Sequence, residues 1–398
     1  MKKVALLTHG IGTGGAERVI SRLSKILLDK CELYLILFDA SIQEYEIHCP
    51  VIDMKMPAKK GVFSKLFLAV ERAVSLHKIK KQYNFDIIIS FLDSPNIVNL
   101  LSKDKKCKTA VSIRNYSDLE NSNSLIGNIL RMGTKLLYKR ADAVIPVTKV
   151  IAQSYHKNYG INEEKLKVIY NPYDIASIEN CAKEELEEEY REFFSNGFII
   201  SSVGRFAYQK GYWHLIKAFY LARKENQELK LCIIGDGKGR EKIQKLINDL
   251  GIENHVLLCG RQENPFKFVA KSDLYVLSSL FEGFPNVLAE AMTVGCPVIA
   301  TDCKSGPREI LYRNPDLNFV CEKIETADFG ILVPPLEKEE NWDKDFFTAG
   351  EKMLSEAIIT AAGNTEKSQE LSKAAKGRAA DFSYPNCAEG YMQIIDMQ

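Results

Sequence analysis

The sequence contains no long hydrophobic run. No apolar stretch of its 398 residues approaches the ~18 residues that a membrane-spanning helix needs. The apolar run near the N-terminus, Val4 to Leu7, is too short for the core of a signal peptide, and no small-residue cleavage site follows it. We therefore expect a cytoplasmic chain.

The cysteines and histidines lack the spacing of a metal site or a disulfide framework. No pair among the 10 cysteines is spaced C-x-x-C, and the 6 histidines are dispersed. Several cysteines, such as Cys232 and Cys259, lie inside apolar strand-like runs. This pattern is typical of buried free thiols in a reducing compartment. Hydrophobic residues make up 46% and charged residues 26%, which excludes disorder as the dominant state.

The net charge of +1 hides an uneven distribution. Residues 1–175 carry a net charge of +10, and residues 176–398 carry −9. A charge difference of this size between two halves favours a polar partner or a membrane surface for one of them.

Short apolar runs alternate with helical patterns along the whole chain, which predicts parallel sheets with crossover helices. The alternation weakens over the acidic stretch 176–195 and then restarts. We expect an α/β protein of two Rossmann-like, doubly wound domains that face a central cleft. Their predicted ranges are 1–180 and 196–384, and residues 385–398 form a terminal helix that we expect to pack back on the N-terminal domain.

A glycine-rich loop follows the first predicted strand. Gly10, Gly12 and Gly15 match G-x-G-x-x-G, and a helix follows. Backbone N–H groups and the helix dipole make such a loop an anion site. Three interpretations stay open: a dinucleotide site with Asp39 on the ribose, a turn that only packs the helix on the sheet, or a phosphate or sugar contact.

The second half carries a more specific set of residues. Gly204 and Arg205 follow a predicted strand, and Lys210 precedes a helix. Open sheets bind ligands at such strand ends, and an arginine with a lysine suits a diphosphate. The alternative is that both are solvated loop cations.

Two glutamates follow a later strand. Glu282 lies in a Gly/Pro turn, and Glu290 lies inside the next helix, with seven residues between them. The free N–H groups at the start of that helix, from Gly283 to Asn286, offer a second anion or hydroxyl site. Carboxylates are good partners for the vicinal hydroxyls of ribose or a hexose.

Three motifs together resemble the family 4 glycosyltransferases, retaining enzymes of the GT-B fold. They are G-G-A-E-R near the N-terminus, G-R-x₄-K-G, and E-G-F-P-N-V-L-x-E-A-M. The run from Cys303 to Leu311 resembles the subgroup that builds bacterial surface glycans, such as capsule or O-antigen. The resemblance covers nearly the whole chain, in the right order.

The resemblance implies roles for individual residues. Arg205 and Lys210 would bind the donor diphosphate, and Glu290 the nucleotide ribose. Glu282 would hold the donor sugar, so that the implied catalytic residues are Glu282, Arg205 and Lys210. Further donor contacts are implied for Gly14, Gly15, Gly204, Arg261, Gly283, Phe284, Pro285 and Asn286. Arg114 and Asn115 occupy a strand end where the acceptor would bind.

The implied reaction moves a hexose or N-acetylhexosamine from a nucleotide-sugar, preferably a UDP-sugar, to a glycan or a polyprenyl-diphosphate-linked acceptor. The resemblance implies same-face attack, so no protein nucleophile is needed. We expect no cofactor, no metal and no nucleic-acid partner. The one D-x-D triplet, Asp343-Lys344-Asp345, lies in a polar stretch outside any strand end.

Other classes of protein remain open. Glu282 and Glu290 are also the pair of carboxylates that a glycosidase needs. A nucleotide-sugar epimerase of similar build, a nicotinamide-dependent enzyme using Gly10, Gly12 and Gly15, and a non-catalytic sugar-binding protein are further alternatives. The last leaves the phosphate site unexplained.

The basic half also predicts a membrane contact at the inner face of the cell membrane. Residues 61–84 form an amphipathic helical pattern with one apolar stripe and five cations elsewhere. The stripe is Phe63, Leu66, Phe67, Val70 and Val74, and the cations are Lys65, Arg72, Lys78, Lys80 and Lys81. A second helix places Arg131, Lys135 and Lys139 at i, i+4 and i+8. The alternative is that each stripe packs on the sheet.

Overall fold

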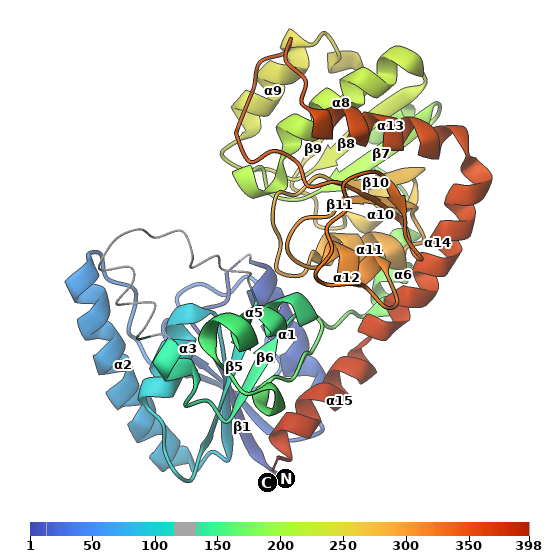
Figure 1. Cartoon of the computed structure of the whole chain (residues 1–398). Helices are drawn as coiled ribbons and strands as arrows, with labels where there is room; N and C mark the ends of the chain where they lie inside the picture. Colours follow the sequence, from blue (N-terminus) through green and yellow to red (C-terminus); the bar gives the residue numbers. More distant parts are fainter. Residues whose placement is uncertain (13, 115–132, 134, 398) are drawn as a thin grey trace. The chain divides into compact units, whose positions relative to one another are not determined.

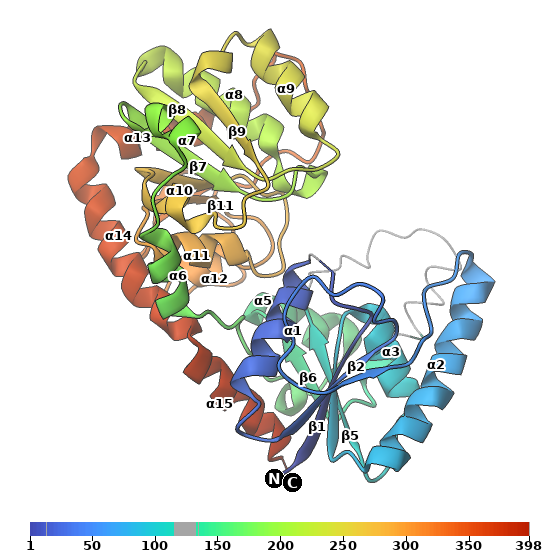
Figure 2. The same ribbon diagram turned by 180° about the vertical axis from the view of Figure 1, so that it is seen from behind.

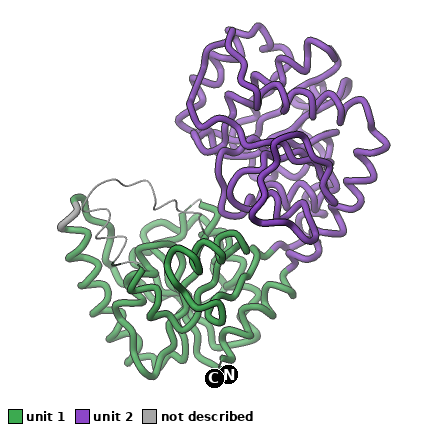
Figure 3. Tube along the Cα trace, in the orientation of Figure 1, with its two compact units in different colours: residues 1–172, 384–398 green, residues 173–383 purple. Residues whose placement is uncertain are grey.

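The computed structural model describes residues 1–12, 14–114, 133 and 135–397. The chain forms two compact units, coloured separately in Figure 3. Unit 1 comprises residues 1–172 and 384–398, and unit 2 comprises residues 173–383. Each unit is described by itself below.

Unit 1 is built on a parallel sheet with strand order β3-β2-β1-β4-β5-β6. The strands are β1 (Lys3–Thr8), β2 (Glu32–Leu37), β3 (Val51–Asp53), β4 (Ile87–Phe91), β5 (Lys108–Ile113) and β6 (Ala143–Pro146). Its helices include α1 (Gly15–Ile26), α2 (Val62–Tyr83), α3 (Asp93–Leu101), α5 (Lys149–Tyr159) and α15 (Tyr384–Ile395).

Helices cover both faces of this sheet (Figures 1 and 2). Successive residues of β1 alternate between the two faces, so that Leu6 packs with α1 and α15, whereas Leu7 packs with α2. A strand that is buried on both faces has a continuous apolar sequence. This explains why β1 and β4 can be recognised as strands from the sequence.

Unit 2 is built on a sheet with strand order β12-β13-β11-β10-β7-β8-β9, in which only the edge strand β12 is antiparallel to its neighbour. The strands are β7 (Phe198–Val203), β8 (Leu229–Ile234), β9 (Val256–Gly260), β10 (Leu274–Leu277), β11 (Val298–Thr301), β12 (Glu325–Thr326) and β13 (Ile331–Val333). Its α-helices are α6 (Ile175–Ala182), α7 (Glu188–Phe194), α8 (Tyr212–Glu225), α9 (Arg240–Asp249), α10 (Phe266–Ala270), α11 (Asn286–Thr293), α12 (Pro307–Leu311), α13 (Ala349–Gly363) and α14 (Thr365–Ala379).

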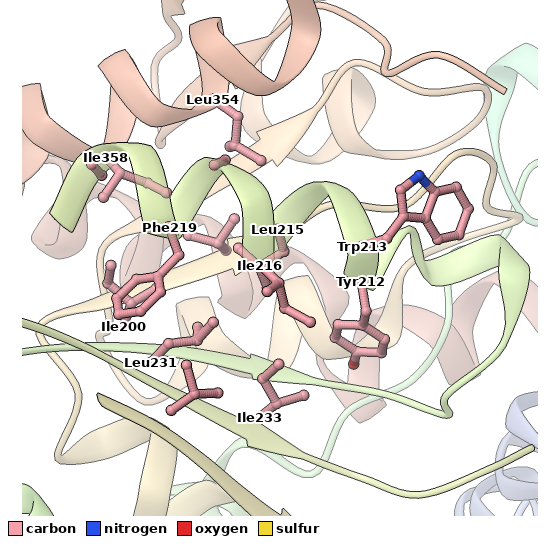
Figure 4. Packing of buried hydrophobic residues seen from close by; sticks show 14 of the residues in the cluster. Ile200, Tyr212, Trp213, Leu215, Ile216, Phe219, Leu231, Ile233, Leu354 and Ile358 are labelled. Atoms are coloured by element: carbon pink, nitrogen blue, oxygen red, sulfur yellow. The ribbon is translucent and has the colours of Figure 1, made fainter. Parts of the chain in front are cut away.

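Helix α8 forms the centre of the largest core of unit 2. Its residues Leu215, Ile216 and Phe219 lie above Leu231 and Ile233 of β8, as Figure 4 shows. Full burial of such side chains contributes ~1.5–3 kcal/mol each. This packing fixes where α8 begins, and with it the position of the loop between β7 and α8.

The expected fold class is confirmed: both units are parallel-sheet, Rossmann-like α/β layers. Strands and helices alternate along both units, as the alternating apolar runs predict. The expected domain end at 180 falls inside α6, whereas the units divide after Pro172. The physical reason is that α6 packs on α10 and α11 of unit 2. The terminal helix α15 packs on α1 of unit 1.

Candidate functional site

The loop between β7 and α8 carries the predicted diphosphate residues. β7 ends at Val203, and the short 3-10 helix η3 (Tyr208–Lys210) leads into α8. At Gly204 a Cβ atom would lie 3.1 Å from Cε of Lys210, so the absence of a side chain leaves room for the lysine to fold back over the strand end. Arg205, in contrast, is exposed to solvent.

Lys210 reaches the predicted sugar-binding carboxylate. Its Nζ lies 2.7 Å from Oε1 of Glu282, and the same oxygen accepts a 2.7 Å hydrogen bond from Ser279 Oγ. Gln209 Nε2 donates to the other carboxylate oxygen over 3.2 Å. Glu282 is only 7% exposed, so its carboxylate is held by three side chains in a largely buried position.

A second loop, after β11, fixes the backbone of the Glu282 turn. Glu282 N donates to Lys304 O, and Ser305 N donates back to Glu282 O over 2.8 Å. Ser305 Oγ also donates to Gly283 O. Gly306 adopts a φ of +106°, and a Cβ there would lie 2.5 Å from Cδ of Pro285. This close approach requires glycine at position 306.

Glu290 lies on α11, one turn after the helix begins at Asn286. The side chain of Glu290 is 4% exposed. Glu290 therefore does not lie on a solvated helix surface. The amide side chain of Asn286 is engaged by the protein, because its Oδ1 accepts a hydrogen bond from Tyr173 Oη.

The remaining predicted donor residues of unit 2 lie on the neighbouring loops. Phe284 is buried and packs edge-on against Phe382, so this residue would contribute its backbone rather than its ring. Arg261 directly follows β9 and is exposed. Among the described residues, the side chains of Arg205 and Arg261 have no ion-pair or hydrogen-bond partner.

In unit 1 the glycine-rich loop leads from β1 into α1. Gly14 is the N-cap of α1, and Gly15 is its first residue. Glu17 lies in the first turn, and its carboxylate lies directly beside Gly14. The Glu17 carboxylate fills the space that a Cβ atom at Gly14 would need, so this approach requires glycine at position 14.

His9, which the motifs left unassigned, follows β1 in the same loop. Its ring packs edge-on against Phe38, with 5.4 Å between the ring centroids. Burial, followed by the nearby Arg72 cation, lowers the pKa of His9 to about 4. The imidazole is therefore neutral at physiological pH.

Arg114 connects separate segments of unit 1 by hydrogen bonds. Its Nη1 donates to Asn171 Oδ1 over 2.6 Å, and its Nη2 donates to Tyr391 Oη of α15 over 3.0 Å. The guanidinium also lies over the ring of Phe91. With 8% exposure, Arg114 links the end of β5 to α15, which gives it a structural task besides any role in binding an acceptor. Asn115 lies outside the described residues.

The predicted apolar stripe on α2 is exposed. Leu66 and Phe67 are 63% and 64% exposed, and Val70 and Val74 are exposed as well. Nothing is described of the Phe63 side chain. Leu68, Ala73 and Leu76 on the other face are buried. The alternative in which the stripe packs on the sheet is therefore wrong for its described side chains.

Two of the five predicted surface cations on α2 are buried instead. Arg72 donates to Met56 O and lies 4.0 Å from the ring centroid of Phe38. Lys80 donates to Asn99 O and Ser102 O, and burial lowers its pKa to about 8. Backbone carbonyl oxygens accept hydrogen bonds from both side chains. Lys65, Lys78 and Lys81 remain exposed.

The second basic helix is described only in part. Arg131 lies outside the described residues, and Lys135 lies over the ring of Tyr159. Among the helices that the structure describes, none combines the length and the apolarity needed to cross a bilayer.

No metal centre is evident in the described ranges, where no three His, Cys, Asp or Glu side chains gather to hold an ion. In the D-x-D triplet, Lys344 pairs with Asp345, and both are exposed. All ten cysteines are free, and nine of them are buried.

Two family models match this chain. Residues 183–327 match the glycosyl transferases group 1, and residues 13–177 match glycosyltransferase family 4. An uncharacterized glycosyltransferase of Methanocaldococcus jannaschii is 34% identical over 347 residues, covering 83% of this chain and 84% of the relative.

A second relative has a named activity. The N-acetylgalactosamine-N,N'-diacetylbacillosaminyl-diphospho-undecaprenol 4-alpha-N-acetylgalactosaminyltransferase of Campylobacter jejuni is 33% identical, covering 78% of this chain and 83% of the relative. Among solved structures, Anabaena HepE in complex with UDP matches with a TM-score of 0.76 at 20% identity, covering 99% of each chain. This likeness concerns the fold alone.

Proposed function

Because this chain belongs to the group 1 glycosyltransferases of the GT-B fold, we propose a specific reaction for it. It transfers a hexose or N-acetylhexosamine from a UDP-sugar to a glycan or lipid-linked oligosaccharide in cell-surface polysaccharide synthesis. The transfer retains the anomeric configuration and needs no metal. The observation that carries the proposal is the partly buried Lys210–Glu282 ion pair at the carboxyl ends of β7 and β10.

The leaving diphosphate requires positive charge where negative charge grows. Lys210 and the exposed Arg205 are both on the loop after β7, and the N-terminus of α11 follows the turn of Glu282. Fixed cations and helix-terminal amides stabilise such charge without a metal ion. This arrangement supports a metal-independent reaction.

The two glutamates suit different parts of the donor. Glu282 is oriented by Ser279, Gln209 and Lys210, so its carboxylate is preorganised to accept hydrogen bonds from the transferred sugar. Glu290 is buried on α11 and suits the two ribose hydroxyls. For retention, the acceptor attacks on the face that the diphosphate leaves, and a phosphate oxygen takes its proton.

The acceptor side of the proposal rests on unit 1. The Campylobacter jejuni relative is named for a diphospho-undecaprenol substrate. In this chain the exposed stripe of α2 and the excess of positive charge in residues 1–175 suit an anionic membrane surface. We therefore propose a lipid-linked acceptor and peripheral membrane binding through unit 1.

A panel of nucleotide-sugars tests the proposal directly. Thermal stabilisation and slow hydrolysis should single out one UDP-sugar, and NMR of the transfer product should show the donor's anomeric configuration. Activity should survive EDTA. An inverted product, or activity lost to EDTA and restored by magnesium or manganese, would contradict the mechanism. Epimerisation of the nucleotide-sugar in the absence of an acceptor would indicate an epimerase instead of a transferase.

A further inference from the structure

Unit 2 contains a cavity of about 540 Å³ beside the candidate site. It lies between the loop after β7, the start of α8, the start of α9 and the segment around Trp342. Arg205 lines the cavity, but Lys210, Glu282 and Glu290 do not. The cavity is therefore separate from the residues that hold the proposed donor sugar and ribose.

Three aromatic side chains form much of its wall. The ring of Tyr208 stacks on Trp213 at 5.6 Å, and Trp213 lies 5.7 Å from Trp342. Figure 4 shows Trp213 at the start of α8, directed away from the core residues around Phe219. Tyr208 is 43% exposed and so presents aromatic surface to a ligand. Aromatic walls with few polar groups are typical of small-molecule sites, and an aromatic face suits the C–H face of a sugar ring.

The charged groups of the cavity are mostly positive. Arg205 and Lys238 are exposed and have no ion-pair or hydrogen-bond partner among the described residues. Lys242 is neutralised by Glu340 at 2.9 Å, and Glu340 also accepts a hydrogen bond from Trp342 Nε1. The N-terminus of the ten-residue helix α9 adds a partial positive charge at Gly239. An anionic ligand is therefore favoured.

Hydrogen bonds hold the walls in place without a ligand. Phe206 N donates to Asp236 O over 2.9 Å, and Gly239 N donates to Phe206 O over 3.1 Å. The hydroxyl of Tyr208 donates to Lys338 O. Because these walls are already ordered, binding a ligand costs little conformational entropy of the protein. A ligand with few contacts can therefore bind measurably.

We propose that this cavity binds an anionic saccharide, a sugar that carries a phosphate or a carboxylate. The sugar ring lies against Tyr208 and Trp342, and its anionic group is paired with Lys238 and Arg205. This site shares Arg205 with the proposed diphosphate site, but it goes beyond the proposed function because it uses neither Lys210 nor the two glutamates.

Intrinsic fluorescence tests the proposal with little ambiguity. The chain contains 2 tryptophans, Trp213 and Trp342, and both line the cavity. Glucose 1-phosphate or glucuronate should change the tryptophan emission saturably, whereas glucose should not. Comparison of the two anions distinguishes a phosphate from a carboxylate ligand. Lys238→Glu should weaken binding by ~10-fold or more. Lys245→Glu, at an exposed position of α9 away from the cavity lining, should not.

Glu290→Gln separates this proposal from the donor site. That variant should leave the anion titration unchanged, even if it loses UDP affinity or if no nucleotide-sugar is turned over at all. An equal response to glucose, or no response to either anion, would overturn the proposal. So would a fluorescence change that only UDP produces and that Glu290→Gln abolishes, since the cavity would then belong to the donor.

Discussion

Lys210 and Glu282 form an ion pair of 2.7 Å that joins η3 to the turn after β10. The two side chains are 16% and 7% exposed. Separating such a pair by removing one partner costs ~3–5 kcal/mol, because the other charge is left buried and uncompensated. In the proposed mechanism, a diphosphate that approaches Lys210 would therefore leave Glu282 in need of a new partner. The hydroxyl groups of a bound sugar would serve, so the proposal predicts that sugar binding and diphosphate binding are coupled.

The first prediction concerns the two cations of the β7–α8 loop. Arg205→Ala should reduce kcat/KM by ~100-fold or more, a loss of about 3 kcal/mol of transition-state stabilisation. Its melting temperature should stay unchanged, because Arg205 is exposed. Lys210→Ala should lose as much activity and also lower the melting temperature, since Glu282 loses its cation. Near-normal turnover in both variants would refute the assigned diphosphate site.

The second prediction separates the two glutamates. Glu290→Gln should mainly weaken UDP binding, and Glu282→Gln should mainly lower kcat, because only Glu282 is positioned towards the reacting sugar in the proposal. Calorimetric titration with UDP and steady-state kinetics measure the two effects. Full turnover with lost UDP affinity in Glu282→Gln would mean that the roles are exchanged.

Much of this arrangement could be predicted from local sequence pattern. Strands buried on both faces are continuous apolar runs, and Arg205, Lys210, Glu282 and Glu290 follow or flank strands of one sheet. What the pattern could not reveal depends on long-range packing. Ser279 lies only three residues before Glu282, but its contact with the carboxylate depends on how the turn folds back.

The cations of α2 illustrate the same limit. Lysine and arginine side chains are usually solvated, so the sequence predicts that Arg72 and Lys80 lie on the surface. Both are buried because carbonyl oxygens of Met56, Asn99 and Ser102 point at them. The positions of these carbonyl oxygens depend on how distant segments of the backbone pack together. The local sequence of α2 does not reveal that packing.

The third prediction concerns Arg114. Arg114→Ala should destabilise the chain by ~2–4 kcal/mol, because it removes charged hydrogen bonds to Asn171 and Tyr391 inside unit 1. Tyr391→Phe should cost only about 1 kcal/mol. Urea denaturation measures both. If Arg114→Ala lost activity at unchanged stability, the side chain would serve the acceptor rather than the fold.

The fourth prediction is a pH dependence of stability. The pKa of His9 is lowered to about 4 in the folded chain, from the ordinary value of 6.5. Its contribution to stability is therefore fully present above pH 6.5 and is lost as the pH falls from 6.5 to about 4. His9→Asn should lose less stability than the wild type over this window. Melting curves of both proteins at several pH values give the difference, and parallel curves would contradict a buried neutral imidazole.

The last prediction is that unit 1 binds anionic bilayers. The exposed side chains Leu66, Phe67, Val70 and Val74 can enter the interface, and the exposed Lys78 and Lys81 lie on the same helix. Each basic group near an anionic surface contributes ~1 kcal/mol, and salt screens this attraction. The protein should therefore sediment with phosphatidylglycerol liposomes at low salt and stay in the supernatant at high salt.

Charge reversal gives the matched comparison for this membrane prediction. Lys78→Glu with Lys81→Glu should reduce the bound fraction by ~10-fold or more, since two attractive groups become repulsive. Lys80 is left unchanged because it is buried, and a carboxylate there would face the carbonyl oxygens of Asn99 and Ser102. The control reverses two exposed lysines of unit 2, Lys245 and Lys352, and should bind like the wild type. Leu66→Ser with Phe67→Ser should also weaken binding at low salt, because burial of apolar area contributes to binding independently of charge. A protein that stays in the supernatant at low salt, or equal binding by both charge-reversed variants, would make a soluble acceptor the better hypothesis.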